Sequence, residues 1–174
     1  PYSTKDAALD YAGSEVDVAR LLAKDWNLDL EIVPTTPASR IPYVLTDKTD
    51  LVISTLSITP ERAKVIDFSV PYSGIQVIIG APKGTALRSI EDLAGKKVAV
   101  VRGSTNDLEL SKVVPAAATV LRFDDDATAI TAVTSGQAEC YCTAPALLAP
   151  VNQRKPDLAM ESKAVVEVSD PAEA

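Results

Sequence analysis

The stretch that decides the fold is Leu51 to Phe68, L-V-I-S-T-L-S-I-T-P-E-R-A-K-V-I-D-F. It opens with a short apolar run, which predicts a buried strand over residues 51–53. Thr59 and Pro60 then predict the start of a helix, because Thr suits the N-cap and Pro suits the first helical position, where its missing N–H costs nothing. A strand followed closely by a helix is typical of an α/β fold.

Polar donors gather at this strand–helix junction. The hydroxyls of Ser54, Thr55 and Ser57 follow the predicted strand. Arg62 falls in the first helical turn, where the helix dipole disfavours a cation. With the free N–H groups of the helix start, these donors favour a small anion, most simply a carboxylate. The alternative is that Arg62 is a surface residue or pairs with a nearby acid such as Glu61.

Helices and strands alternate on both sides of this stretch, which supports the α/β class. Upstream, Ser14 begins a predicted helix whose buried face includes Trp26, residues 28–33 alternate like a strand, and residues 39–45 predict a short helix. Downstream, helices are predicted between strands at residues 75–80, 97–101, 119–123 and 139–143, with late strand candidates at 158–161 and 165–168.

The breaks in this pattern divide the chain. The run A-P-K-G at residues 81–84 reads as a linker, and we place a domain crossing there. Residues 1–80 then form a first lobe that carries the carboxylate half-site. Residues 81–168 form a second lobe, and residues 169–174 are a further crossing or a tail.

A second donor cluster follows the strand predicted at residues 97–101. In V-A-V-V-R-G-S-T-N-D, a glycine allows a tight turn, and Ser104, Thr105 and Asn106 begin a helix whose free N–H groups favour an anion or a carbonyl. Simple helix capping is the alternative. Ligands of open α/β sheets bind at the carboxyl ends of strands, where both clusters fall. Two half-sites on two lobes predict a cleft that closes on its ligand.

Composition excludes several classes of function. The net charge of −7 over 174 residues argues against nucleic acid or an anionic membrane surface as partner. The absence of His rules out histidine-based catalysis and histidine metal sites. Cys140 and Cys142 are expected to be free buried thiols, and two thiolates make an incomplete zinc site. The seven glycines form no phosphate loop, so we expect no metal, nucleotide or redox cofactor.

The run S-T-L-S-I-T-P-E-R-A-K-V-I-D-F-S-V-P-Y resembles the signature of the periplasmic amino-acid-binding proteins, the type 3 solute-binding proteins of ABC importers. The resemblance implies a two-lobe architecture of the type II periplasmic binding proteins, with a ligand cleft between the lobes. It implies that Arg62 grips the ligand α-carboxylate and that the R-G-S-T turn at residues 102–105 contacts the same group. The implied partners are a small carboxylate ligand, an amino acid or a derivative, and the membrane subunits of an importer. The implied location is periplasmic or extracytoplasmic.

The chain departs from the family pattern in two ways. It looks as though it lacks the first strand and the C-terminal return segment. Ala144 falls where the family has an Asp that takes the ligand ammonium, so simple neutral amino acids are expected to bind weakly unless another acid, such as one from residues 124–126, replaces it. Arg40 falls near the cleft rim, either to contact a second acidic group or to remain solvated.

Two other functions compete with ligand capture. The resemblance also extends to cyclohexadienyl or arogenate dehydratase-like enzymes on the same fold. That chemistry needs a placed general acid, and with no His and no recognisable cleft carboxylate we expect no enzyme. The other alternative is a ligand-sensing input domain of a receptor. A membrane span and a kinase domain encoded after residue 174 would favour it.

Overall fold

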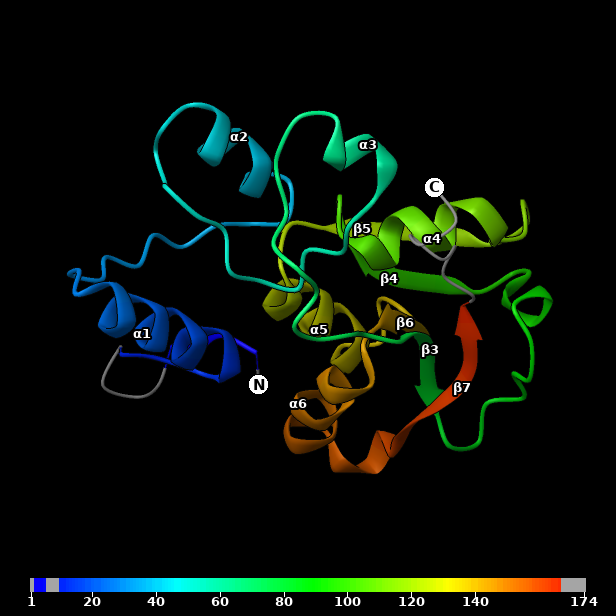
Figure 1. Cartoon of the computed structure of the whole chain (residues 1–174). Helices are drawn as coiled ribbons and strands as arrows, with labels where there is room; N and C mark the ends of the chain where they lie inside the picture. The colour runs from blue at the N-terminus through cyan, green and yellow to red at the C-terminus, as the bar shows by residue number, and fades with distance from the viewer. Residues whose placement is uncertain (1, 6–9, 167–174) are drawn as a thin grey trace.

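The chain folds into a small lobe and a larger lobe built on a five-stranded sheet (Figure 1). This computed structural model describes residues 2–5 and 10–166. The helices are α1 (Ser14–Trp26), α2 (Arg40–Leu45), α3 (Pro60–Ala63), α4 (Thr105–Val113), α5 (Asp126–Thr134) and α6 (Leu148–Arg154). The strands are β1 (Thr4–Lys5), β2 (Tyr11–Ala12), β3 (Val77–Pro82), β4 (Lys97–Val101), β5 (Thr119–Phe123), β6 (Cys140–Thr143) and β7 (Met160–Val166). Short 3-10 turns lie at Glu91–Leu93, Pro145–Leu147 and Pro156–Leu158.

The large sheet has the strand order β5-β4-β6-β3-β7. Strand β4 runs parallel to β5 and β6, whereas β3 runs antiparallel to both β6 and β7. Val77 at the start of β3 pairs with Val166 at the end of β7. The chain therefore enters this sheet and leaves it at the same end.

Helices cover both faces of the large sheet. On one face, alternate residues of β3 such as Val77 and Ile79 pack with Leu110 of α4. On the other face, Ile78 packs with Tyr141 of β6 and with apolar residues of α5 and α6. Because the central strands are covered on both sides, their sequences are nearly continuous apolar runs rather than alternating ones.

The predicted elements of the second lobe are mostly confirmed. The strands expected at residues 97–101 and 119–123 match β4 and β5. The two late candidates are one strand, β7, and residues 167–168 lie outside the described part of the chain. Since β3 already begins at Val77 in the large sheet, a boundary after residue 80 would cut that strand. We retain the division into two lobes as a proposal, with the crossing moved to before Val77. Residues 169–174 are not among those described.

The strand predictions in the first lobe were wrong. Residues 28–33 and 51–53 have the expected apolar patterns, but neither segment forms a strand. A strand requires a hydrogen-bonded neighbour, and in the described residues the only ladder of this lobe is the short β1–β2 pair. The side-chain pattern alone does not report whether such a neighbour exists.

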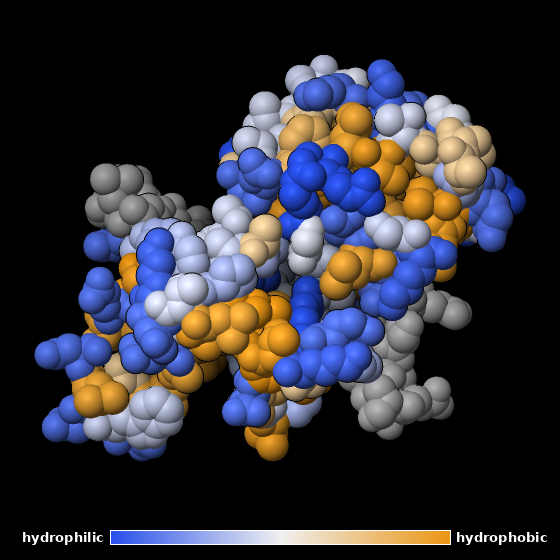
Figure 2. Space-filling view, turned by 90° about the horizontal axis from the view of Figure 1, so that it is seen from above, coloured by the Kyte–Doolittle hydropathy of each residue, from blue (hydrophilic) through white to orange (hydrophobic). Residues whose placement is uncertain are grey.

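The small lobe also exposes large apolar side chains. Trp26, predicted to be buried in α1, is 53% exposed, and Leu21 on the same helix is 67% exposed. Figure 2 shows apolar surface on the left half of the view, the side that holds α1 and α2 in Figure 1. The helical spacing correctly predicted α1, but it did not predict how little of the helix is covered.

The two cysteines are free and buried in β6, as expected. Burial raises the pKa of the Cys140 thiol to about 11 and also raises that of Cys142. Both thiols pack in the core beside β3 and β4 residues and act as small apolar groups.

Candidate functional site

The start of α3 has the predicted geometry. The Thr59 hydroxyl accepts a hydrogen bond from the Arg62 N–H at 3.2 Å, and Pro60 occupies the first helical position. Arg62 is buried, with 8% of its surface exposed. The alternative of a solvated or simply ion-paired Arg62 is therefore wrong, because the side chain turns inward and its hydrogen-bond partners are uncharged.

The Arg62 guanidinium joins the two predicted donor clusters. Its Nη1 donates to the Ser57 carbonyl at 2.8 Å and to the Thr105 hydroxyl at 3.2 Å. Its Nη2 donates to the Gly103 carbonyl at 3.4 Å. The Thr105 hydroxyl in turn donates to the Ser57 hydroxyl at 3.1 Å. These contacts hold the first lobe against the start of α4.

The turn before α4 is locally determined. Ser104 is the N-cap, and its hydroxyl accepts a hydrogen bond from the Asp107 N–H at 3.2 Å. The Asp107 carboxylate accepts one from the Gly103 N–H at 3.0 Å, and Gly103 has a φ of 70°, which favours glycine. The first turn of α4 therefore presents its N–H groups at a fixed position beside Arg62.

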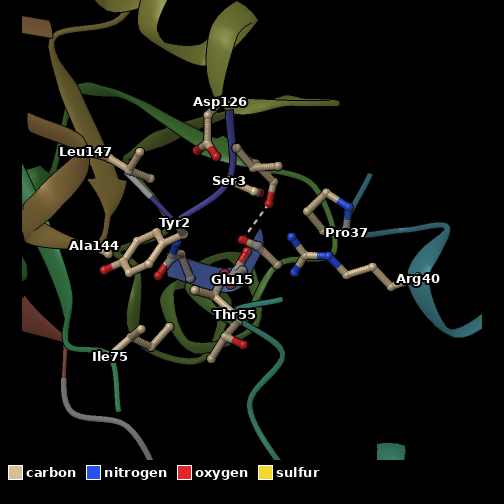
Figure 3. A pocket seen from close by; sticks show the side chains of 14 residues that line it. Tyr2, Ser3, Glu15, Pro37, Arg40, Thr55, Ile75, Asp126, Ala144 and Leu147 are labelled. Carbon is tan, nitrogen blue, oxygen red and sulfur yellow. Dashed lines mark hydrogen bonds between the residues drawn. The ribbon is translucent and has the colours of Figure 1, made fainter. Parts of the chain in front are cut away.

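A cavity of about 90 Å³ lies between the lobes next to these contacts. It is lined by residues from both lobes, which include most of the predicted site: Thr55, Ser104, Thr105, Asn106, Arg40 and Ala144 (Figure 3). Arg62 and Ser57 do not line it directly, but both bond to Thr105, which does. Ser54 is also absent from the lining, and its buried hydroxyl has no hydrogen-bond partner.

Glu15 in the first turn of α1 is a cavity residue that the sequence analysis missed. An acid in the first turn is already explained by the helix dipole, so nothing in the sequence indicated that Glu15 belongs to a site. The residue is 6% exposed, its N–H donates to the Tyr2 carbonyl at 3.0 Å, and Ser3 donates to its carboxylate. Its Oε1 is buried without a hydrogen-bond partner. Burial raises the pKa of Glu15, although Arg40 and Ser3 oppose the shift.

Arg40 points into the cavity toward Glu15 (Figure 3). Burial lowers the pKa of its guanidinium, while the charges of Glu15 and Asp126 oppose that shift. Its Nε is buried without a partner, and Arg40 takes part in none of the ion pairs found in the described part of the chain. The guanidinium therefore has donors available inside the cavity.

Asp126 at the start of α5 supplies a second carboxylate to the cavity wall. The Tyr141 hydroxyl donates to its Oδ1 at 2.7 Å, which fixes the carboxylate beside the cavity. Residues 124–126 were considered as a replacement for the acid that Ala144 lacks, and one of them lines the cavity. Weak binding of simple neutral amino acids was expected because Ala144 provides no carboxylate for the ligand ammonium. Glu15 and Asp126 both line the cavity, so that reason no longer holds. No cleft carboxylate was recognisable in the sequence, but Glu15 and Asp126 line the cavity in the structure.

The Arg62 guanidinium places a positive charge beside Thr105 at the start of α4. Burial lowers the pKa of Arg62, and the charge of Glu109 opposes this shift. An arginine remains protonated under such shifts because its ordinary pKa is so high. Arg62 and the start of α4 thus form a cationic region that adjoins the cavity through Thr105.

The described residues contain no group of three or more His, Cys, Asp or Glu side chains that could hold a metal ion. The expectation of no cofactor stays a prediction. No helix in the described ranges is long and apolar enough to cross a membrane.

Comparison with known proteins gives consistent matches. The sequence model of one protein family, the bacterial extracellular solute-binding proteins, family 3, matches residues 1–167 of this chain. The glutamine-binding protein GlnH of an ABC transporter of Bacillus subtilis is 35% identical over 140 residues, which cover 78% of this chain and 51% of that protein. The chain thus spans about half the length of such curated relatives.

Solved structures show the same architecture. An ancestral arginine-binding protein bound to arginine superposes with a TM-score of 0.89 at 31% identity, covering 98% of this chain and 76% of that one. An ancestral amino-acid-binding protein described as a precursor of cyclohexadienyl dehydratase superposes with a TM-score of 0.81 at 36% identity, covering 97% and 73% of the two chains. Both are two-lobe α/β proteins of the type II binding-protein fold.

Proposed function

Because the chain belongs to family 3 of the bacterial extracellular solute-binding proteins, we propose that it captures an amino acid for import by an ABC transporter. The observation that carries the proposal is the contact between Arg62 of the first lobe and Thr105 of the second, which places a guanidinium beside a hydroxyl that lines the cavity. A carboxylate is the group that such donors bind best. The names of relatives support the class of ligand, since they bind glutamine, histidine, cystine or arginine.

In this proposal the ligand carboxylate lies between Arg62 and the first turn of α4. Thr55, Ser57 and Thr105 provide hydroxyls around it. Ligand binding would then strengthen the hydrogen bonds that already hold the lobes together, which is how a two-lobe protein closes on its ligand. The membrane subunits of the transporter would recognise the closed form outside the cytoplasm.

We propose binding without catalysis. The relatives named above are binding proteins, and the precursor of cyclohexadienyl dehydratase is itself described as an amino-acid-binding protein. Glu15 and Asp126 line the cavity, and we assign both carboxylates to recognition of a charged ligand and not to acid–base chemistry.

The test is to identify what the protein binds. Small molecules released from purified full-length protein are identified by mass spectrometry, and candidates are then titrated by calorimetry against wild type and Arg62→Ala. Binding of an amino acid that is lost in Arg62→Ala supports the proposal. If no amino acid binds, or if Arg62→Ala binds as tightly as wild type, the proposal fails.

A further inference from the structure

A buried acid lies in the first turn of α4. Asp107 is the third residue of this helix, and its side chain is only 9% exposed. A carboxylate in the first turn is attracted by the same positive helix end that would attract the carboxylate of a ligand. The charge of Asp107 therefore opposes the binding of an anion at that end unless another group neutralises it.

The N–H groups of this turn divide into two sets. Those of Gly103 and Asp107 are used within the turn, by the Asp107 carboxylate at 3.0 Å and by the Ser104 hydroxyl at 3.2 Å. Thr105 and Asn106 line the cavity, and the described part of the chain contains no acceptor for their N–H groups. A carboxylate bound by these two N–H groups would lie within one helical turn of Asp107.

Arg122 of β5 neutralises this buried acid. Its Nε donates to Asp107 Oδ1 at 2.8 Å, and its Nη2 donates to the Ser111 hydroxyl at 2.9 Å. The Ser111 hydroxyl also donates to Asp107 Oδ1, at 3.4 Å. Among the ion pairs that the described residues form, Arg122 is the one partner of Asp107.

The charge of Asp107 reaches the buried groups around the turn. Burial raises the pKa of the Cys142 thiol in β6, and the charge of Asp107 raises that pKa further. The thiol lies against the same turn, because Cys142 Sγ donates to the Asn106 carbonyl at 3.6 Å. Since buried charges are poorly screened, the Arg122 guanidinium determines how much of this negative charge a nearby carboxylate experiences.

We propose that Arg122 is a positioning residue for ligand capture: it holds and neutralises Asp107, which then fixes the turn at residues 102–105 without repelling a carboxylate bound at the start of α4. The inference rests on the proposed function, because it assumes that a ligand carboxylate binds beside Thr105 and Asn106. Arg122 is not one of the residues that line the cavity, so it acts through Asp107.

Calorimetry on the full-length protein measures the effect. Wild type is titrated with the standard L-amino acids and L-cystine, and the one that binds most tightly is the probe for every variant. Arg122→Met is expected to weaken that amino acid about tenfold, because Asp107 is left charged without its partner. Arg122→Lys keeps the charge and is expected to stay within about threefold of wild type. Arg122→Gln keeps a hydrogen-bond donor without the charge, and it is expected to lose about as much affinity as Arg122→Met.

Removal of the acid separates an electrostatic role from a structural one. The amide introduced by Asp107→Asn carries no charge but can still accept a hydrogen bond from the Gly103 N–H. We therefore expect Arg122→Met combined with Asp107→Asn to bind the same amino acid at least about threefold more tightly than Arg122→Met alone. A structural role without an electrostatic one predicts no recovery, because the double variant does not restore the ion pair.

The matched control is the exposed pair of Asp17 and Arg20 on α1, whose side chains are 3.5 Å apart. Arg20→Met is expected to bind the probe within about twofold of wild type, both alone and combined with Asp17→Asn. Circular dichroism checks that each variant is folded. If Arg122→Met does not fold, the comparison of Arg122→Lys with Arg122→Gln decides.

Three results would overturn the inference and leave the proposed function standing. They are a folded Arg122→Met within about twofold of wild type, equal affinities of Arg122→Lys and Arg122→Gln, and a double variant that binds no more tightly than Arg122→Met. If the wild-type protein binds no amino acid, the proposed function is overturned and this inference falls with it.

Discussion

Arg62 at the start of α3 donates a hydrogen bond to the hydroxyl of Thr105 at the start of α4, across 43 positions of sequence and 3.2 Å of space. Both side chains are buried, with 8% and 4% of their surfaces exposed. The two residues belong to different lobes, and each was identified separately from its own strand–turn–helix pattern. Their contact defines where the lobes meet and gives the first prediction.

Arg62→Ala is expected to abolish measurable binding of the native ligand. A charge-assisted hydrogen bond contributes roughly 1.5–3 kcal/mol, and an unpaired buried carboxylate costs more. Calorimetry on wild type and variant measures the loss. An affinity within about threefold of wild type would rule out the carboxylate-binding role, since that difference is under 1 kcal/mol.

Thr105→Val is expected to weaken ligand binding less than Arg62→Ala does. The substitution keeps the shape of the side chain but removes the hydrogen bonds to Arg62 and Ser57. The charge-assisted bond to Arg62 contributes roughly 1.5–3 kcal/mol and the neutral bond to Ser57 ~1 kcal/mol. The Arg62 guanidinium retains its bond to the Ser57 carbonyl. Titration of the same ligand against the two variants gives the order directly, and a Thr105→Val protein weaker than Arg62→Ala would contradict it.

Glu15→Gln is expected to stabilise the ligand-free protein at neutral pH. Folding raises the pKa of Glu15, so the folded state holds the proton more tightly and the free energy of unfolding falls as the pH rises through the raised pKa. The amide lacks this penalty. Thermal unfolding at about pH 7 should give a higher Tm for the variant, and the gain should shrink toward about pH 4, near the ordinary pKa of Glu. A gain that is independent of pH would refute the explanation.

Gly80→Ala is expected to destabilise the large sheet. A Cβ at this position of β3 would overlap the Leu148 side chain of α6, and overpacking of a core typically costs about 1–3 kcal/mol. Gly84→Ala is the matched control, because a Cβ there meets no atom within 4 Å. Urea unfolding should show a lower midpoint for the first variant alone. Equal midpoints would mean that Leu148 moves aside at little cost.

Cys140 and Cys142 are expected to resist thiol reagents in the folded protein. Both are buried in β6, and burial raises their pKa values, that of Cys140 to about 11, so little reactive thiolate forms near neutral pH. Labelling with a chromogenic disulfide should be slow in buffer and complete in denaturant. Rapid labelling in buffer would place at least one thiol at the surface.

The sequence was most informative where local chemistry determines structure. The cap formed by Thr59 and Pro60 and the glycine turn before Ser104 depend on residues a few positions apart, and both were predicted correctly. Strand β4 was predicted within its bounds because its apolar run after Lys97 is buried on both faces. Strand β5 was also predicted within its bounds, although it is a partly exposed edge strand.

The rest depends on distant contacts. Glu15 and Asp126 each have a sufficient local explanation as an acid in the first turn of a helix, so nothing in the sequence required a second role for either. Their convergence with Arg40 on one cavity appears only when the lobes are brought together. The missing strands at residues 28–33 and 51–53 have the same cause, since pairing requires a neighbour that side-chain patterns do not specify.

The pairing of Val77 with Val166 has a consequence for protein engineering. A segment running from one to the other starts and finishes at adjacent points at one end of the large sheet. Modules of this kind can be spliced into a surface loop of an unrelated host, because the graft leaves the two flanking host segments close to their original separation. The same adjacency would allow a short linker to join Val166 to Val77, so that the second lobe could be circularly permuted by itself.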